Sequence, residues 1–563
     1  MPRAWTTPGG AATPRRPCES MWLRHPGAPG CRCRCSTSRL RLAHRWPRFW
    51  GRSCGLWQRW CRGVQTKSLP KIATAWMPGI SCFISGWGCR AMHRSPPELV
   101  DIVRNGLPPV NGPRKTVVIL GAGIAGLAAA RELRAAGHVV TVLEASQRVG
   151  GRIRTLREPF SPGQYAEAGP MRIPKSHVLV REYVDLFTLT MRPFRSFNPA
   201  AWFCSHGHRI RLGDVVSGQA PAEFPLEASE RSLTLHDRWE RLLAPYRARI
   251  GNDPSMWVRI RDQLQQLSLR ELLHRAGWSD AAIELYGLVA GFETLLSASA
   301  AEFLGEELQD LRSGTSAIEG GMDQLPQAFL PDVGDCIRFG TRVHALDQDD
   351  HGVKVHVETV GGRSVVEGDM AICTLPFSVL RHIEVLCPFS WNKRKAIRNL
   401  HYEAATRVFF EASERFWETT DGITGGASVT DQAIRTVYYP ERKPHGTRGV
   451  LMASYCHGQD ALRWGALSPT ERLVQARENL AEVHPGCEQY LTAGASVVWS
   501  QDPYAGGAYA FFQPYQEREL HDAIVAPEGR YHFAGEHASK QHRWMEGAIE
   551  SALRAACAIH LHP

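Results

Sequence analysis

The chain has 563 residues, enough for two to four domains that bury sizeable cores. Its net charge of +10 consists of +16 in residues 1–95 and −6 in the remainder, so the larger part gives no reason to expect nucleic-acid binding. No membrane-spanning helix is predicted, because Pro78 and three glycines interrupt the uncharged run 72–89.

Residues 1–95 differ in composition from the rest of the chain. They hold 15 Arg and 2 Lys against a single acid, with eight of the 15 Cys and eight of the 17 Trp, and they show no helical or strand period. We interpret residues 1–112 as a disordered basic extension, with Met77 or Met92 as an alternative start of the working protein. A tail for anionic partners and a targeting or metal-binding segment are the alternatives. The cysteines of Cys31–Cys35 alternate, which is not the spacing of a zinc site.

The clearest local pattern is a predicted β-α-β unit between Lys115 and Arg152. Val117–Leu120 is a short apolar run, as expected for a buried parallel strand, and Val139–Leu143 is a second. The Ala- and Leu-rich segment Ile124–Ala136 between them predicts a helix that ends at Gly137.

Gly121, Gly123 and Gly126 stand in the G-x-G-x-x-G spacing of dinucleotide-binding proteins. The first allows the tight turn, the second lets the backbone approach a pyrophosphate, and the third lets helix and strand pack closely. Glu144, directly after the second strand, is suited to a ribose diol. Arg152 follows a further glycine pair. This feature resembles that of flavoproteins with two dinucleotide-binding domains, in which the arginine reaches the FAD pyrophosphate or the flavin edge, and it favours FAD over NAD.

The later segments alternate between helical and strand patterns. Residues 163–187 predict a loop and an amphipathic helix, and residues 230–310 are mostly helical. From Ile337 the pattern predicts strands, with a hairpin at Asp349–Gly352 and a buried strand in 369–376. Residues 531–560 predict strand, loop and helix. The cysteines outside the extension are scattered and odd in number, which favours free thiols of a reducing compartment: Cys204, Cys336, Cys373, Cys387, Cys456, Cys487 and Cys557.

From Lys115 to His560 the chain resembles the flavin amine oxidase family, and within it the L-amino acid oxidases. The resemblance is carried by GAGIAGL, LEASQRVGGR, AGPMRIP, EGGMDQLPQAF, HYEAATRVFF, ASYCHG and FAGEHASKQHRWMEGAIES. It implies an α/β fold with two dinucleotide-binding domains for FAD, a mixed-sheet substrate domain and a helical insertion. The implied boundaries are 113–175, 311–380 and 525–563 for the FAD-binding parts, 176–229 and 381–524 for the substrate domain, and 230–310 for the insertion.

The resemblance also implies site residues. Arg172 of AGPMRIP holds a substrate carboxylate beside the flavin, and Tyr455 shares it. Glu536 lies on the ribityl–pyrophosphate side of FAD, and Trp544 forms an aromatic wall of the substrate cavity. Further contacts to the cofactor are implied for Ala125, Gly169, Met171, Val343, Met545 and Ala548. No metal site is implied.

Two residues depart from the family pattern. Arg407 stands where the family often has a lysine that assists oxygen reduction or imine hydrolysis, and arginine cannot become a neutral amine. Arg543 stands where the amino acid oxidases usually have glycine. Its side chain either charges the pocket, which favours an acidic or polar substrate, or points to solvent.

The predicted reaction is FAD-dependent oxidation of an L-amino acid to a 2-oxo acid, with ammonia and hydrogen peroxide as the other products. The alternatives are an amino acid 2-monooxygenase, an amine or polyamine oxidase, and a flavin-binding protein without catalysis. The predicted partners are an amino acid and O2, without nucleic acid or membrane, and a homodimer is one expectation. The expected location is the cytoplasm, with secretion as the alternative.

Overall fold

The computed structural model describes residues 96–253, 255–291, 293–308, 314–441 and 446–562. The predictions for residues 1–95, including the alternative starts at Met77 and Met92, lie outside the described residues.

Helix α2 (Pro96–Asn105) corrects the prediction that a disordered extension reaches residue 112. Leu99, Ile102 and Val103 are at most 4% exposed, and their spacing gives the helix one apolar face. This face joins the same core as residues of α4 (Val178–Leu186) and α20 (Met545–His560). Neighbouring prolines concealed the helix in the sequence, although the first helical turn tolerates proline.

Five parallel strands form the central sheet, in the order β22-β13-β1-β2-β9. They are β1 (Thr116–Leu120), β2 (Val139–Leu143), β9 (Ile337–Arg338), β13 (Met370–Cys373) and β22 (Tyr531–Phe533). Val117–Leu120 at the centre is 0% exposed, which explains its apolar run. With α3 (Ile124–Ala135) between β1 and β2, the predicted β-α-β unit is confirmed.

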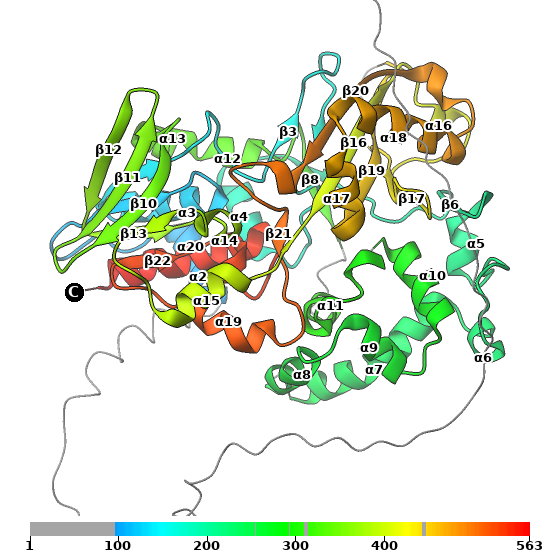
Figure 1. The fold of residues 1–563 in the computed structure, drawn as a ribbon, viewed down its shortest axis with the longest axis horizontal. Helices are drawn as coiled ribbons and strands as arrows, with labels where there is room; N and C mark the ends of the chain where they lie inside the picture. The colour runs from blue at the N-terminus through cyan, green and yellow to red at the C-terminus, as the bar shows by residue number, and fades with distance from the viewer. Residues whose placement is uncertain (1–95, 254, 292, 309–313, 442–445, 563) are drawn as a thin grey trace, which may run out of the picture. The chain divides into compact units, whose positions relative to one another are not determined.

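The two faces of this sheet have different cores. Val117 and Ile119 pack with α3 and α20, whereas Val118 and Leu120 pack with a four-stranded sheet. That sheet has the order β12-β11-β10-β14, at the left of Figure 1, and its strands are β10 (Arg342–Gln348), β11 (Val353–Thr359), β12 (Gly362–Gly368) and β14 (Glu384–Val385). The pairing of β10 with β11 confirms the predicted hairpin.

A seven-stranded mixed sheet forms a second layer, in the order β20-β16-β19-β18-β17-β6-β7. Its strands are β6 (Trp202–Ser205), β7 (His208–Arg211), β16 (Ala405–Ala412), β17 (Ala427–Thr430), β18 (Thr436–Tyr438), β19 (Gly449–His457) and β20 (Leu491–Val498). Every residue of β16 is buried. The register places Arg407 of β16 directly opposite Tyr455 of β19, so two predicted site residues become neighbours.

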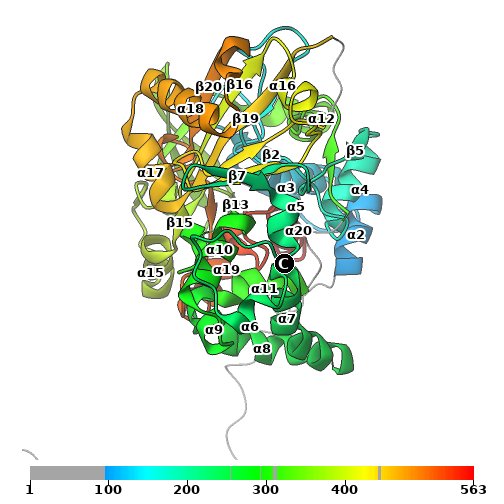
Figure 2. The same cartoon turned by 90° about the vertical axis from the view of Figure 1, so that its right-hand side faces the viewer.

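The helices predicted between residues 230 and 310 are confirmed. They are α7 (Leu235–Asn252), α8 (Met256–Leu264), α9 (Leu269–Arg275), α10 (Asp280–Ala290) and α11 (Ala300–Leu308). Capping boxes at Thr234 and Ser268 fix the starts of α7 and α9, because each side chain accepts from the backbone three residues on. These helices lie together below the seven-stranded sheet in Figures 1 and 2.

Shorter elements complete the described fold. The short strands are β3 (Thr155–Leu156), β4 (Ala166–Glu167), β5 (Met191–Pro193), β8 (Ser316–Ile318), β15 (Tyr402–Glu403) and β21 (Tyr509–Ala510). The further helices are α5 (Leu212–Val216), α6 (Ala228–Arg231), α12 (Gln324–Ala328), α13 (Leu330–Val333), α14 (Phe377–Leu380), α15 (Trp391–Asn399), α16 (Phe416–Thr419), α17 (Gly458–Ala466), α18 (Pro469–Val483) and α19 (Gln516–Val525).

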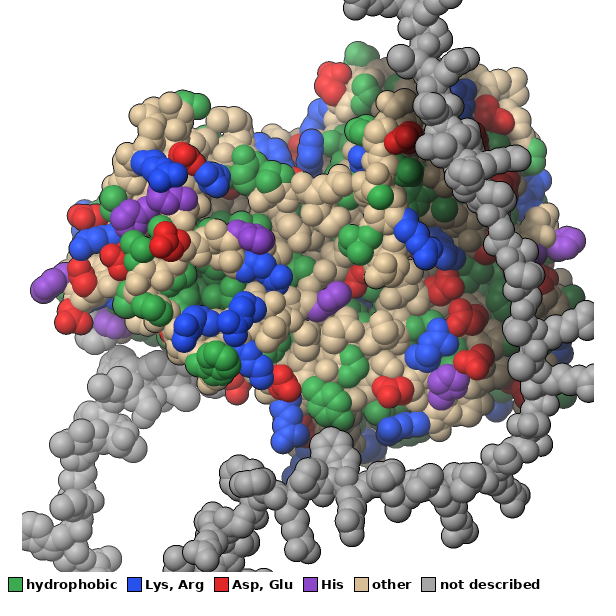
Figure 3. Space-filling view, in the orientation of Figure 1, with side chains coloured by type: hydrophobic (Ala, Val, Ile, Leu, Met, Phe, Trp, Pro, Cys, Tyr) green, Lys and Arg blue, Asp and Glu red, His purple; other side chains and the backbone are tan. Residues whose placement is uncertain are grey.

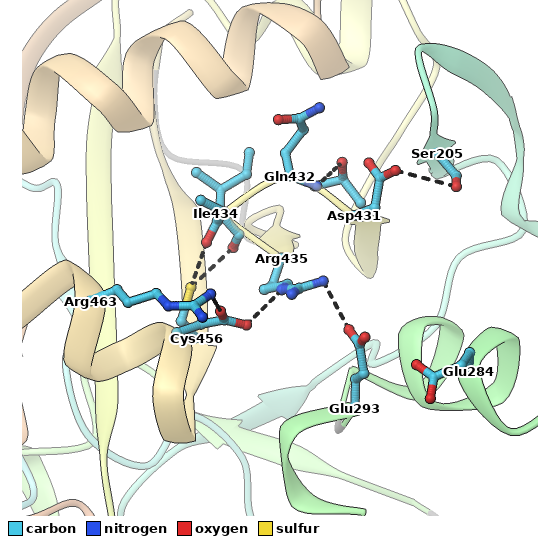
Figure 4. Close-up of polar contacts among 12 residues, drawn as sticks. Ser205, Glu284, Glu293, Asp431, Gln432, Ile434, Arg435, Cys456 and Arg463 are labelled. Carbon is cyan, nitrogen blue, oxygen red and sulfur yellow. Dashed lines mark hydrogen bonds and ion pairs between the residues drawn. The ribbon is translucent and has the colours of Figure 1, made fainter. Parts of the chain in front are cut away.

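Arg435 joins the helical insertion to the seven-stranded sheet (Figure 4). It lies between β17 and β18, and its Nη1 is 2.8 Å from Oε2 of Glu293, in the 3-10 helix (Glu293–Leu295) that follows α10. Its Nε is 2.7 Å from Oδ2 of Asp460 in α17. One guanidinium therefore connects three separate elements.

Acidic and basic side chains are both scattered over the face seen in Figure 3. Among the described helices, none combines the length and the apolar character that crossing a membrane requires.

Candidate active site

A cavity of about 890 Å³ lies beside the glycine turn after β1, and its volume is within the range of cofactor and ligand sites. Every predicted site residue except Gly126 lines it: Gly121, Gly123, Ala125, Glu144, Arg152, Gly169, Met171, Arg172, Val343, Arg407, Tyr455, Glu536, Trp544, Met545 and Ala548. These residues come from sequence segments that are up to about 400 positions apart, and the fold brings them to one space.

Gly126 lies behind the cavity wall and has a packing role. A Cβ at this position would stand 2.0 Å from the carbonyl oxygen of Gly121, so α3 could not approach the turn. Gly121 has φ +103, and a Cβ there would stand 2.8 Å from Oγ1 of Thr374. The first and third glycines thus shape the turn, while the second borders the cavity, where its Cβ would meet nothing within 4 Å.

Glu144 fixes the turn from the end of β2. One oxygen accepts from the backbone N–H of Ala122 at 2.8 Å, and the other accepts from the backbone and hydroxyl of Ser146 at 2.8 and 2.6 Å. A carboxylate has about four acceptor positions, so these three bonds leave room for one hydroxyl from the cavity.

Arg152 and Glu536 form an ion pair across the cavity wall, 384 residues apart in sequence. Nη1 of Arg152 donates to Oε1 of Glu536 at 2.7 Å and to the carbonyl oxygen of Ala508 at 3.1 Å. Glu536 also accepts from the backbone N–H groups of Ala510 and Arg543. Burial alone would raise the pKa of Glu536, but Arg152 and nearby histidines hold it below its ordinary value. The ion pair gives the buried acid the counterion that it requires. Arg152 also lines the cavity, and its place at the pyrophosphate or flavin edge stays a prediction.

Arg172 presents an unpartnered guanidinium to the cavity. It follows β4 in a loop, is half-buried, and forms no hydrogen bond or ion pair with any residue that the structure describes. A cation held in a cavity without a protein anion is suited to an anionic ligand.

Arg407 holds the loop that carries Arg172. Its Nη1 donates to the carbonyl oxygen of Glu167 at 2.8 Å and to that of Gly169. Its guanidinium lies 4.1 Å from the centre of the Tyr455 ring. The Arg407 side chain therefore contacts protein groups, and its role here is to fix the positions of Gly169 and Tyr455.

Arg543 lies in the cavity wall, so its side chain does not point to solvent. Nε donates to Oε1 of Glu306 at 2.5 Å, and Nη2 donates to Oε2 of the same carboxylate. The indole N–H of Trp544 also donates to Oε1 of Glu306, at 2.8 Å. Glu306 of α11 therefore holds two neighbouring residues of the wall.

Three residues of this region were missed by the sequence analysis. His457 and Tyr509 line the cavity, and their Nδ1 and hydroxyl oxygen are 3.0 Å apart. His457 lies two positions after Tyr455 on β19, so the strand period could have indicated it. Glu306 had no such signal, because it belongs to a helix without a motif.

His457 is a neutral histidine among cations. Burial lowers its pKa to about 3, and Arg407, Arg543 and Arg172 act in the same direction. The ring centre of His457 is 4.3 Å from that of Tyr455. These contacts define one group of cavity residues, which we call the cationic group: Arg172, Arg407, Tyr455, His457, Tyr509 and Arg543.

The lining fits FAD. Gly123 begins α3 without a side-chain cap, and Trp544 begins α20 without one, so the backbone N–H groups of two helix starts are free to meet oxygen atoms of a ligand. Glu144 and Val343 would hold the adenosine half. Met171 and the start of α20 would border the flavin, the group that carries the redox chemistry.

The sequence profile of the family described as "Flavin containing amine oxidoreductase" matches residues 124–560. The protein YobN of Bacillus subtilis (strain 168) is 38% identical over 475 residues, covering 83% of this chain and 98% of that protein. An L-amino-acid oxidase of Protobothrops flavoviridis is 34% identical over 466 residues, covering 82% and 91%.

Solved structures show the same fold at low identity. A triple mutant of putrescine oxidase aligns with a TM-score of 0.64 and 22% identity, over 79% of this chain and 98% of that one. The predicted fold class is thus confirmed. The chain belongs to the flavin-containing amine oxidoreductase family and is a flavin-dependent oxidoreductase whose cofactor is FAD.

Proposed function

We propose that the protein oxidises an L-α-amino acid, with O2 and water as co-substrates, to the 2-oxo acid, ammonia and hydrogen peroxide. The observation that carries the proposal is the unpartnered guanidinium of Arg172 in the cavity. An enzyme for simple amines has no use for a free cation there, whereas a carboxylate binds it in two parallel hydrogen bonds. The name of the Protobothrops flavoviridis relative supports the same reaction.

The arginines and Tyr455 of the cationic group then have distinct tasks. Arg172 holds the α-carboxylate, and the Tyr455 hydroxyl donates to the same group. Arg407 fixes the backbone beside Arg172 and Tyr455, and thereby the position of the substrate Cα. The remaining guanidinium charges disfavour a cationic amine, so the substrate amine binds neutral without a dedicated base. When bound, FAD accepts the two electrons of the oxidation.

The test replaces Arg172 by methionine in the FAD-loaded protein. We expect kcat/KM for the best of the twenty amino acids to fall by about 100-fold or more, since a buried charged pair is lost. The kcat/KM of Arg172→Lys should lie between those of the wild type and Arg172→Met, because an ammonium cannot bind both carboxylate oxygens in the guanidinium geometry. Anaerobic flavin reduction followed by absorbance measures each rate, and Arg104→Met, which removes an exposed arginine outside the cavity, is the control.

The alternatives make different predictions in the same assay. Retained activity of Arg172→Met toward amines would identify an amine oxidase. Release of carbon dioxide in place of peroxide would identify a monooxygenase. A bound flavin that no amino acid or amine reduces would identify a protein without catalysis. Any of these results would overturn the proposal.

A further inference from the structure

Arg543 lies in the cavity wall with a strained backbone conformation. Its φ is +62, in the left-handed region that favours glycine, and the sequence resemblance has glycine at this position. A non-glycine residue there costs on the order of 1 kcal/mol, so the strain points to a role of the side chain. The half-buried guanidinium lies near aromatic rings, 5.2 Å from the centre of the Phe511 ring.

The contacts of Arg543 orient the guanidinium and leave part of it available. Glu306 takes Nε and Nη2, which fixes the plane of the group. Nη1 donates to no residue that the structure describes, and the residue borders the cavity. The oxygens of Glu306 already accept three hydrogen bonds from Arg543 and Trp544, so this carboxylate is occupied behind the wall.

The neighbours of Arg543 also present donors. His457 is neutral, and its Nδ1 is engaged with the Tyr509 hydroxyl. Its Nε2 has no partner among the described residues. If the Tyr509 hydroxyl donates to Nδ1, Nε2 carries the hydrogen and is a donor on a residue that lines the cavity.

Positive charge is in excess around His457. Three arginines of the cationic group line the cavity, and so do the acids Glu536 and Asp502. Glu536 is paired with Arg152, and Asp502 accepts from two backbone N–H groups of its own loop. Glu306 offsets Arg543, and the substrate α-carboxylate would offset Arg172. Burial raises the pKa of Glu167, behind Arg407, to about 7, so it offsets Arg407 only in part at neutral pH. Glu403, beyond Tyr509, is already engaged with His401.

We propose that the substrate is a dicarboxylic L-amino acid, whose side-chain carboxylate binds Nη1 of Arg543 and Nε2 of His457. Arg543 and His457 are then specificity-determining residues, and Glu306 is a positioning residue that acts through Arg543. This inference rests on the proposed oxidation of an L-amino acid. A lysine or arginine substrate would place a fourth cation in the group, and a leucine would leave the donors unpaired.

A binding experiment tests the inference without turnover. Isothermal titration of the FAD-loaded protein compares glutarate with pentanoate and succinate with butanoate, pairs that differ in one carboxylate. We expect one dicarboxylate to bind at least about tenfold more tightly than its partner. In Arg543→Gly, which suits the backbone at φ +62, the ratio should fall to about two or less, and in the control Arg104→Ala it should persist. Equal affinities within both pairs, or an undiminished ratio in Arg543→Gly, would overturn the inference.

Anaerobic flavin reduction gives the second readout. L-glutamate and L-aspartate are compared with L-glutamine, L-asparagine, L-leucine and L-lysine. We expect one acid to exceed its amide by about 100-fold in kcat/KM, because a charged hydrogen-bonded partner is replaced by a neutral one. The same ratio should fall in Arg543→Gly and, if that variant does not fold, in His457→Phe.

The two proposals fail in different ways. If leucine or lysine is the best substrate, the dicarboxylic inference is wrong and amino acid oxidation stands. If amines reduce the flavin and no amino acid does, the proposed function itself is wrong. A preference for acidic substrates that persists in Arg543→Gly and in His457→Phe would show that Arg543 and His457 do not determine specificity.

Discussion

Glu546 shows how a single buried acid is satisfied by backbone groups. It lies in the first turn of α20, is 3% exposed, and accepts from the N–H groups of Leu179 and Val180 at 2.9 Å each. Those N–H groups belong to the first turn of α4, so the carboxylate caps a second helix. Burial raises the pKa of Glu546 to about 7, and the two hydrogen bonds only partly oppose this effect.

The raised pKa predicts a dependence of stability on pH. The folded pKa of about 7 exceeds the ordinary value of 4.5, so the contribution of Glu546 to stability is complete below pH 4.5 and declines as the pH rises to 7. Relative to Glu546→Gln, the wild type should lose about 3 kcal/mol across this window. Melting temperatures of both proteins at several pH values measure the difference, and a constant gap between pH 4.5 and 7.5 would contradict the prediction.

At the scale of elements, the Arg435 contacts decide how firmly the helical insertion is held. Asp460 is 8% exposed and Glu293 is 31% exposed at the side chain, and both depend on the same guanidinium. Asp460 has a second partner in Arg463, but that side chain is 80% exposed and contributes little. Gly291 and Thr436, close to this junction, line the cavity, so the junction also bounds the site.

Replacement of Arg435 by alanine should loosen the insertion locally. We expect faster backbone hydrogen exchange in α10 and the following turn, residues 280–296, with a local loss of about 1–3 kcal/mol for the unpaired acids. Arg448→Ala is the matched control, because Arg448 pairs with Glu411 of β16 and does not contact the insertion. Exchange that is equal in all three proteins would show that other contacts hold the junction.

The sequence predicted elements whose signal is local. The strands around Gly121 and the hairpin at Asp349–Gly352 have apolar periods and turn residues that specify them within a few positions. Helix α2 was missed because its prolines resemble a linker. The partnership of Arg543 with Glu306 was not predictable, since 237 residues separate them and only the packing of α11 brings them together.

For the site, the sequence indicated the residues of the cavity wall but not the partners of their charged side chains. Motifs identified the residues of the cavity wall, with Gly126 of the predicted set lying behind it, because contact with a cofactor or substrate would constrain a residue's type. The partners of Arg152, Arg407 and Arg543 carry no such constraint in a single sequence, and a buried charge takes whichever counter-group the tertiary fold supplies.

At the scale of the whole molecule, the described cysteines are free thiols that differ in their exposure. No disulfide joins any two cysteines in the described part of the chain. Cys387 is exposed, whereas Cys373 and Cys456 are buried, and burial raises the pKa of each of these two thiols to about 12. Access therefore favours reaction at Cys387, and burial disfavours the reactive thiolate form of Cys373 and Cys456.

Alkylation of the native protein should modify Cys387 well before the buried thiols. Peptide mass spectrometry after brief treatment with iodoacetamide resolves each site, and unfolding in denaturant should make Cys373 and Cys456 reactive. Cys387→Ser removes the expected first site among the seven described cysteines and serves as the control. Rapid labelling of Cys373 in the native protein would mean that the central sheet opens readily.

The pairing of Arg152 with Glu536 has a consequence for biosynthesis. Ribosomes produce the glycine turn at Gly121 early and α20, which begins at Met545, more than four hundred residues later, so no growing chain can enclose the dinucleotide until that helix has emerged. Loading must then follow translation, and cells short of riboflavin would accumulate full-length polypeptide awaiting its coenzyme.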